Sequence, residues 1–322
     1  MDWKGLVRLI ISLVLLAALL LWVDLRPVQE ALTEVSPLGL MWAVIWLVVG
    51  YAIAAWRLHV LCQSGGVPVA PCTLASSYAM GLFFNCVLPT SVGGDAVRIL
   101  YLSKRGYELR GLVVTGIVDR LLGFLTLGLL SGLALMAAPL WVAGISGVPV
   151  WFGAMLLVTT VVGSMFLPVL TRRIGRWSGQ FGGRRVAEIL ARYGDSLRLL
   201  CAAPRAVVAA LALSVLAHVL VTLSYLACGW ALLDDFPWQG YFIAAPLVML
   251  FQILPISLGG LGVRELSTVG VLVWLGADKA QAVALSLAYL GVVWLSVLPG
   301  LAMAVYKGVR RQDVERSETR DQ

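Results

Sequence analysis

LPTSVGGDAVRIL, residues 88–100, interrupts a chain in which 60% of the residues are hydrophobic. Proline removes a backbone hydrogen-bond donor, and glycine adopts conformations that other residues avoid. The pattern therefore predicts that one helix ends at Pro89 and that a second, short helix begins at the glycine pair, Gly93 and Gly94. Together the two helices would form an interrupted hairpin over about 72–103.

The composition places the chain in a bilayer. Only 13% of its 322 residues are charged and its mean hydropathy is +0.92, whereas about a quarter of the residues of a soluble domain are charged. The chain is predicted to be an all-α polytopic membrane protein, because six stretches have roughly the 20 apolar residues that a spanning helix needs. These stretches are 6–23, 38–56, 112–138, 148–170, 206–233 and 280–306.

The basic residues are placed unevenly. The net charge is +7, and most of the 24 lysines and arginines fall in alternate connections between the apolar stretches. Arginines and lysines gather on the cytoplasmic side of membrane proteins, so this distribution predicts that both termini are cytoplasmic and argues against nucleic-acid binding. The basic groups lie at 4–8, 57, 104–110, 172–205 and 307–320.

The opening stretch has a second copy. NCVLPTSVGGDAVRIL at 85–100 aligns without a gap on FQILPISLGGLGVREL at 251–266, and half of the positions are identical. Shared leucine and valine content does not explain identical proline, serine, glycine and arginine positions. The matched pairs are Pro89 with Pro255, Ser91 with Ser257, Gly93 with Gly259, Gly94 with Gly260, and Arg98 with Arg264.

The two copies are predicted to have opposite orientations. The first hairpin lies between the basic residues Arg57 and Lys104. The second, at about 241–276, lies between Asp234 and Asp235 on one side and Asp278 and Lys279 on the other. Three predicted spans separate them, and an odd number inverts the second copy. Broken helices at membrane depth are tolerated where they line a cavity, and paired interrupted segments in inverted repeats are typical of transporters with a binding site near the midplane.

Both copies carry features that favour an anion. In each copy a short helix is predicted to begin at the glycine pair, and the amides at a helix N-terminus attract negative charge. The guanidinium of Arg98 or Arg264 suits phosphate oxygens. We therefore predict that the two arginines hold a lipid phosphate between them. The alternative is that each arginine only caps carbonyls or pairs with a local acid.

The acidic residues differ between the copies, since Asp95 is matched by a leucine and Glu265 by an isoleucine. Each carboxylate could contact a cationic headgroup, take up a proton or neutralise a neighbouring arginine. Adjacent Asp119 and Arg120 point about 100° apart on a helix and should reach different partners. Asn85, the only asparagine, could line the first hairpin or bond to a neighbouring carbonyl.

Other features carry less information. The segment 171–205 combines arginines with apolar residues at helical spacing, which predicts an amphipathic helix on the cytoplasmic surface among anionic lipids. The cysteines and histidines form no metal-ligand pattern, and no nucleotide-binding motif occurs, so no metal and no cofactor are expected. His218 is more typical of a packing histidine than of a proton relay. Gly128 and Gly132 predict a face for close helix packing.

Three motifs resemble one family. NCVLPTSVGGDAVR, DRLLG at 119–123 and LPISLGGLGVRE at 254–265 are similar to those of the flippase-like family that includes the transmembrane domain of lysylphosphatidylglycerol synthase. The resemblance covers nearly the whole chain and implies lipid translocation; the synthase domain of the family's best-known type is not found here. It implies roles for the motif residues Pro89, Gly93, Gly94, Asp95, Arg98, Asp119, Arg120, Pro255, Gly259, Gly260, Arg264 and Glu265.

These observations predict a lipid flippase, not an enzyme, with one transmembrane domain over 1–306 and a charged cytoplasmic tail over 307–322. Its partner would be a membrane phospholipid or another lipid-linked substrate, and its location would be the bacterial inner membrane. A homodimer is compatible with the sequence, which does not determine the oligomeric state. The alternative is a membrane transferase that acts on a polyprenyl- or phospholipid-linked substrate. The substrate-binding candidates are Asn85, Ser91, Gly93, Gly94, Asp95, Arg98, Asp119, Arg120, Ser257, Gly259, Gly260, Arg264 and Glu265, with Pro89 and Pro255 as helix breaks.

Overall fold

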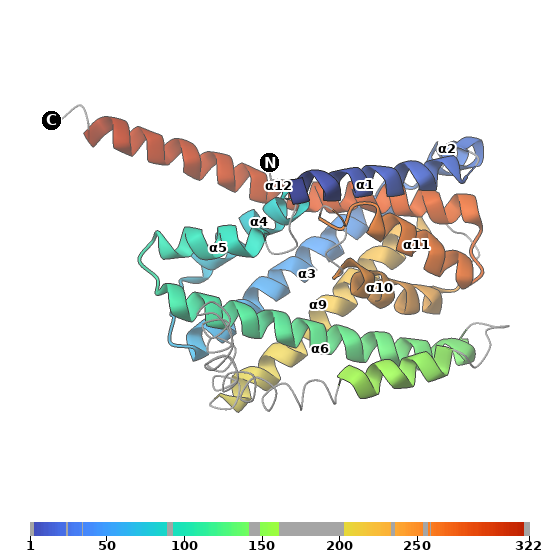
Figure 1. Cartoon of the computed structure of the whole chain (residues 1–322), viewed down its shortest axis with the longest axis horizontal. Coiled ribbons are helices and arrows are strands. Elements are labelled where there is room, and N and C mark those ends of the chain that lie inside the picture. The colour runs from blue at the N-terminus through green and yellow to red at the C-terminus, as the bar shows by residue number, and fades with distance from the viewer. Residues whose placement is uncertain are drawn as a thin grey trace.

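The described part of the chain is helical. The computed structural model describes residues 3–23, 25–33, 35–88, 93–141, 149–160, 203–232, 236–253, 257 and 259–318, and these contain no strand (Figure 1). The predicted amphipathic segment 171–205 lies almost wholly outside them. The helices are α1 (Trp3–Leu21), α2 (Leu25–Thr33), α3 (Pro37–Ser64), α4 (Pro71–Val87), α5 (Gly93–Ser103), α6 (Leu109–Trp141), α9 (Pro204–Trp230), α10 (Trp238–Gln252), α11 (Val263–Trp274) and α12 (Lys279–Glu318), and Pro149–Thr160 is also helical.

Four of the described helices are long and apolar enough to cross a membrane: α3, α6, α9 and the part of α12 from Lys279 to Tyr306. Shorter apolar helices, Leu6–Leu19 and Pro149–Thr160, lie where the other two spans are predicted. A multi-pass membrane protein is therefore supported, while six spans and the placement of the termini stay predictions. α12 continues to Glu318, so the predicted tail begins as an extension of this helix.

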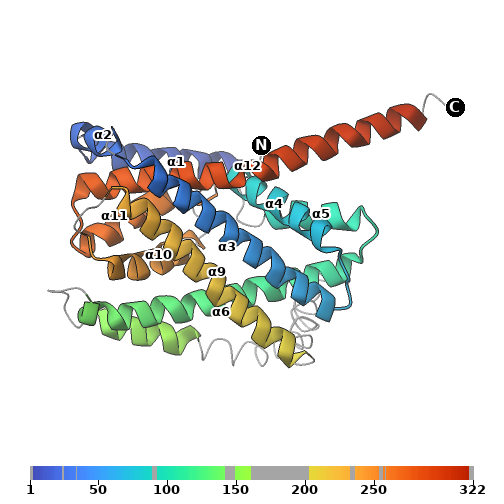
Figure 2. The ribbon, with the colours of Figure 1, turned by 180° about the vertical axis from the view of Figure 1, so that it is seen from behind.

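Helices α3 and α9 pack side by side along most of their length (Figure 2). Glycines allow this close approach: a Cβ on Gly39 would lie 2.7 Å from the Cβ of Ala231, and one on Gly50 would lie 3.4 Å from the Cβ of Leu220. Both helices are apolar over most of their length, as expected of helices that lie in lipid.

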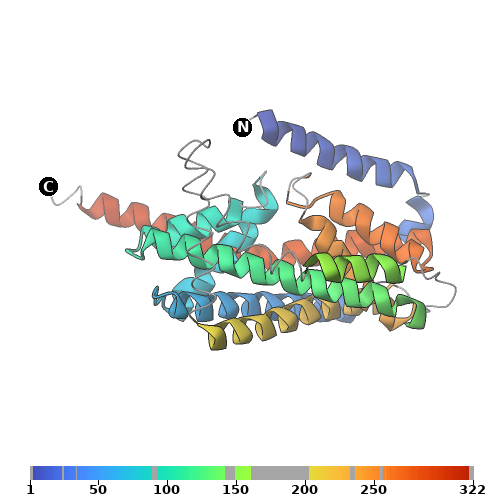
Figure 3. The ribbon, with the colours of Figure 1, turned by 60° about the horizontal axis from the view of Figure 1, so that its bottom comes forward.

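Helix α6 packs against Pro149–Thr160 through small residues, as predicted. A Cβ on Gly128 would lie 2.5 Å from the hydroxyl of Thr160, and one on Gly132 would lie 2.5 Å from the Leu157 side chain. These glycines therefore let the two helices approach closely. Helix α1 lies along the outer edge of the molecule (Figure 3), and its C-terminal end is tied to α12 by Lys279, whose Nζ donates to the carbonyl of Trp22 at 2.7 Å.

Two helical hairpins, α4 with α5 and α10 with α11, occupy the positions predicted from the repeat. α5 begins at Gly93, as predicted. The prediction that the second short helix also begins at its glycine pair is wrong, because α11 begins at Val263. Gly259 and Gly260 have φ of +57° and +83°, in the left-handed region that a right-handed helix cannot continue through.

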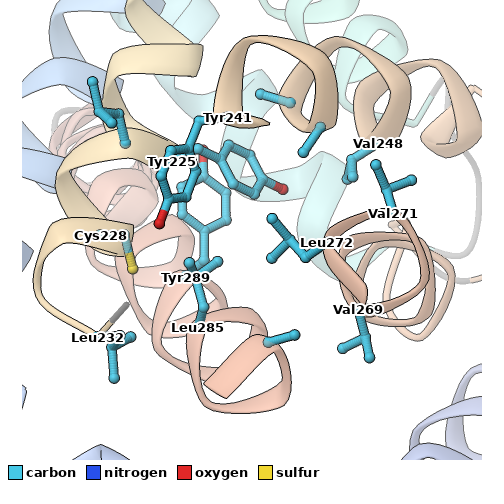
Figure 4. Close-up of a cluster of buried hydrophobic side chains, with 14 of the residues drawn as sticks. Tyr225, Cys228, Leu232, Tyr241, Val248, Val269, Val271, Leu272, Leu285 and Tyr289 are labelled. Atoms are coloured by element: carbon cyan, nitrogen blue, oxygen red, sulfur yellow. The ribbon is translucent and has the colours of Figure 1, made fainter. Parts of the chain in front are cut away.

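The largest hydrophobic core surrounds the second hairpin (Figure 4). Tyr225 of α9 and Tyr289 of α12 stack with ring centroids 3.7 Å apart, and Leu272 of α11 lies close to them. The core beside the first hairpin is smaller and includes Leu74 of α4 and Leu102 of α5. The second hairpin is therefore held in the body of the protein, and the first lies nearer its polar interior.

Candidate functional site

A cavity of about 330 Å³ lies among helices α3, α4, α5, α6, α9 and α10. Charged side chains from three of these helices line it. They are Arg57 of α3, Asp95 and Arg98 of α5, and Asp119 and Arg120 of α6, and His218 of α9 lies beside them.

The cavity lies within the apolar length of the helices. Asp119 is about a third of the way along α6, and His218 is at the centre of α9. A charged residue at the centre of a membrane helix costs about 3 kcal/mol or more, unless it is paired or faces a cavity. Here the charged groups are both paired and gathered around one cavity, which is the arrangement expected of a binding site at membrane depth.

Asp119 connects three helices. Its Oδ1 accepts a hydrogen bond from Nε of Arg57 at 2.7 Å, and Nη1 of the same arginine donates to Oγ of Ser214 on α9 at 2.8 Å. A Cβ on Gly123 would lie 3.5 Å from Nη1 of Arg57, so this glycine leaves room for the guanidinium. The bond of Asp119 thus joins α6 to α3 and, through Arg57, to α9.

Asp95 is held by two arginines. Its Oδ1 lies 3.3 Å from Nη2 of Arg98, one turn along α5, and its Oδ2 accepts a hydrogen bond from Nε of Arg120 on α6. The guanidinium of Arg98 also lies over the ring of Tyr78, 5.4 Å from the centroid. The prediction that Asp119 and Arg120 reach different partners is confirmed, since Asp119 pairs with α3 and Arg120 with α5.

Asn85 holds the first hairpin closed. Its Oδ1 accepts a hydrogen bond from the backbone amide of Gly94 at 2.8 Å, so this amide at the start of α5 already has a partner. A Cβ on Gly94 would overlap the carbonyl oxygen of Gly81, which shows how closely α4 and α5 approach. Asn85 also lines the cavity, as the first of the two interpretations predicted. The bond that its Oδ1 makes differs from the second interpretation, because the partner is a backbone amide and not a carbonyl.

The second copy of the motif is closed on itself. Arg264 donates from Nε and Nη2 to Oε1 of Glu265, at 2.9 and 2.6 Å, and Oε2 of Glu265 accepts from the amide of Gly262 at 2.6 Å. Glu265 is fully buried, and neither residue is among those that line the cavity. Of the three roles open to Glu265, the geometry matches neutralisation of the neighbouring arginine, together with a cap on α11.

The two hairpins touch at their tips. A Cβ on Gly259 would lie 2.7 Å from the carbonyl oxygen of Asn85 and 3.0 Å from that of Cys86, at the end of α4. Met249 and Gln252 of α10, with Ile253 directly after it, complete the cavity wall on this side. The second hairpin therefore contributes a wall to the cavity, while its arginine points into a different polar cluster.

The other predicted site residues are only partly described. Pro89, Ser91 and Pro255 lie outside the described residues. Ser257 is described and buried, and Gly260 stands with Gly259 in the turn before α11. The predicted helix breaks at the two prolines agree with the ends of the flanking helices, α4 at Val87 and α10 at Gln252.

Arg57 is the main site residue that sequence reasoning missed. The sequence pattern places it among the cytoplasmic charges, because the predicted apolar stretch ends at residue 56. α3 continues to Ser64, so Arg57 lies inside the helix and is only 7% exposed. The apolar residues that continue at helical spacing through Leu58, Leu61 and Cys62 could have indicated this.

The family comparison agrees with the motifs. The family described as "Lysylphosphatidylglycerol synthase TM region" matches residues 6–300. The chain belongs to this family. No curated protein sequence gives a significant match. Membership in the lysylphosphatidylglycerol synthase transmembrane family links the chain to lipid metabolism or transport in a membrane. The cavity lies wholly within the matched part, so the site and the family assignment concern the same domain.

Proposed function

We propose that the protein moves a lipid with a phosphate-bearing headgroup between the two leaflets of a membrane. The observation that carries this proposal is the cavity at membrane depth, lined by three arginines and two aspartates. An ionic headgroup costs many kcal/mol to transfer through hydrocarbon, since a charge loses its hydration there. A charged cavity among spanning helices replaces part of that hydration.

The apolar part of the lining supports a lipid cargo. Leu82, Phe124 and Met249 line the cavity together with the charged side chains. A space of about 330 Å³ is at the lower end of the range for small-molecule sites, about 300 to 1,000 Å³. It is suited to a headgroup, while the acyl chains stay between the protein and the surrounding lipid.

Arg98 is the proposed phosphate contact. It lines the cavity, it belongs to the repeated motif, and its pairing with Asp95 at 3.3 Å is longer than the other ion pairs of the site. The predicted clamp between Arg98 and Arg264 would require Arg264 to leave Glu265, since it pairs with that carboxylate here. We therefore propose that Arg98 binds the phosphate and that Arg264 supports the fold of the second hairpin.

The test is leaflet exchange in liposomes. Purified protein is reconstituted, and the transbilayer movement of acyl-labelled phospholipids is compared with that in protein-free vesicles. Arg98→Ala should slow exchange by about 10- to 100-fold, since a hydrogen bond to a charged group is worth about 1.5–3 kcal/mol. Arg105→Ala is the matched control, because Arg105 follows the same helix and stacks on Tyr101 outside the cavity.

Three outcomes would contradict the proposal. Exchange no faster than in protein-free vesicles overturns lipid translocation. Equal rates for Arg98→Ala and Arg105→Ala overturn the phosphate contact. A new lipid product, detected by mass spectrometry after incubation with lipids and candidate donors, would favour the membrane transferase instead.

A further inference from the structure

We propose that a groove between α1 and the second hairpin holds one acyl chain of a phospholipid, with the phosphate of that lipid beside Lys279. None of the described residues that line this groove also lines the charged cavity. The proposal therefore concerns a second lipid site, and it does not depend on lipid translocation.

The groove consists of two adjoining cavities of about 470 and 320 Å³, which share Leu15 and Leu266. It lies where α1 packs beside α11 (Figure 1). Its lining runs from Leu15 to Trp22 along the α1 segment, a length of roughly 10 Å at about 1.5 Å per residue. The larger cavity is lined by Leu15, Phe251, Val263, Leu266, Gly270 and Val271, together with Ser267, and the smaller one adds Ala18, Leu19 and Trp22.

Contacts at both ends of the groove hold α1 against the hairpin. At one end, a Cβ on Gly262 would lie 2.9 Å from the Cβ of Leu15 and 2.9 Å from the carbonyl oxygen of Ser12. At the other end, Nζ of Lys279 donates to the carbonyl of Trp22 at 2.7 Å and lies 3.4 Å from the centroid of its ring. A helix with a diameter of about 10 Å cannot enter between these two contacts, whereas a single hydrocarbon chain can.

The lining of the groove is apolar. Its larger cavity has one polar side chain among the described residues, Ser267, and the Oγ of this serine already donates to the carbonyl of Arg264 at 3.0 Å. Apolar spaces without hydrogen-bonding partners do not hold water well. Phe251 and Leu266 are exposed, so the groove is open to its surroundings, which for a membrane protein are the hydrocarbon chains of lipids. An acyl chain is therefore the occupant that this lining fits.

Lys279 places a positive charge at the Trp22 end of the groove. Its ammonium has three donors, and the carbonyl of Trp22 accepts from one of them. The carboxylate next to it, Asp278, accepts with Oδ1 from the amides of Ala280 and Gln281 and so caps α12. Tryptophan is enriched where hydrocarbon meets the headgroups. A lipid with its chain in the groove would therefore have its phosphate at this end, beside the lysine.

The experiment uses phosphatidylglycerol with a photoreactive diazirine in one acyl chain. Delipidated protein in detergent is incubated with this lipid and irradiated, and the labelled peptides are mapped by mass spectrometry. Label should concentrate on 263–271 and on the residues of α1 that line the groove. Gly270→Leu should lower this labelling by about fivefold or more, a factor that corresponds to about 1 kcal/mol of lost packing, because the leucine side chain fills the groove.

Gly291→Leu is the matched control. Gly291 is also an exposed glycine inside a helix, α12, a Cβ there would also meet nothing within 4 Å, and it does not line the groove. Its labelling on α11 should equal that of the wild type. Ala18→Leu fills the groove from the opposite wall and should lower the labelling as Gly270→Leu does, so it provides the test if Gly270→Leu does not fold.

A second comparison tests the phosphate. Lys279→Gln should weaken labelling by phosphatidylglycerol and leave labelling by a diacylglycerol with the same photoreactive chain unchanged, because only the first lipid carries a phosphate. Equal losses for the two lipids, or no loss for either, would overturn the contact with Lys279.

Two results would overturn the acyl-chain site. One is label spread evenly over α11 and the exposed faces of α3 and α9, which would indicate ordinary surrounding lipid. The other is labelling of α11 that neither Gly270→Leu nor Ala18→Leu reduces. A groove filled by the protein itself would leave α11 unlabelled and would also overturn the proposal. Each of these results leaves the proposed translocation through the charged cavity unaffected.

Discussion

The two hairpins carry the same motif and use it differently. In the first, Arg98 and Asp95 line the cavity, and Asp95 is shared with Arg120 of another helix. In the second, Arg264 and Glu265 pair with each other and are enclosed by the main hydrophobic core. The arginine of the motif therefore faces the cavity in one copy and pairs within the second hairpin in the other.

The glycine pairs show a similar contrast. Gly93 and Gly94 are the first residues of α5, and Gly94 allows close approach to α4. Gly259 and Gly260 instead form a left-handed turn before α11. The glycine pair is thus required for close packing in the first hairpin and for a positive φ in the second. Substitutions at the two positions can distinguish these two requirements.

The largest expected effect tests the second hairpin. Glu265→Ala leaves the buried guanidinium of Arg264 without its partner and should reduce the free energy of unfolding by about 3–5 kcal/mol. Asp95→Ala should cost less stability, because the Asp95 side chain is 18% exposed and that of Glu265 is 0% exposed. Thermal melting in detergent measures both; equal losses would mean that the two pairs play the same role.

The next effect tests close packing in the first hairpin. Gly94→Ala places a Cβ against the backbone carbonyl of Gly81, and it should destabilise the protein by about 3 kcal/mol or more. The oxygen belongs to a helix backbone and cannot turn away as a flexible side chain would. A melting midpoint equal to that of the wild type would show that α4 and α5 are farther apart than described.

Substitution of Gly260, which has a positive φ in the second hairpin, should have a smaller effect on stability. Gly260→Ala should cost about 1–3 kcal/mol from backbone strain alone, because the nearest atom to its Cβ would be 3.5 Å away. Gly260→Asn should cost less than Gly260→Ala, since asparagine tolerates the left-handed region. Gly94→Asn should show no such recovery. If asparagine is no better than alanine at 260, conformation is not what requires this glycine.

Ser214→Ala tests the link from the cavity to α9. It removes the hydroxyl that accepts from Nη1 of Arg57 at 2.8 Å and should cost about 1.5–3 kcal/mol, because the bond involves a charged group. Ser296→Ala on α12 is the control, since Ser296 is also buried and bonds only within its own helix, to the carbonyl of Val292. The control should lose clearly less stability than Ser214→Ala.

The substitution with the smallest expected effect, Gly270→Ala, should stabilise the protein. Gly270 lies inside α11, and a Cβ there would meet nothing within 4 Å. Gly270→Ala should therefore raise the free energy of unfolding by about 0.5–1 kcal/mol, since alanine favours the helix over glycine. A loss of stability would indicate that a neighbour covers this face of the second hairpin.

Several elements could be predicted from the sequence because their causes are local. Pro89 and the glycine pair at 93–94 place the helix break between α4 and α5 within a few residues of its position. Adjacent residues on a helix point apart, so Asp119 and Arg120 could be assigned to different partners before the partners were known. The all-helical class follows from apolar length, which is also a local property.

The amino-acid sequence by itself determined the helical membrane class, the positions of the two interrupted hairpins and the family. It also identified most of the charged residues that line the cavity. Only the tertiary structure decided that Arg57 belongs to the cavity, that Arg98 faces it and that Arg264 does not. The reason is physical: the sequence places charges along a helix, but which charge pairs with which depends on the helices that pack beside it. Asp95 has Arg98 within its own helix and Arg120 in another, while Glu265 finds its arginine next to it in the chain.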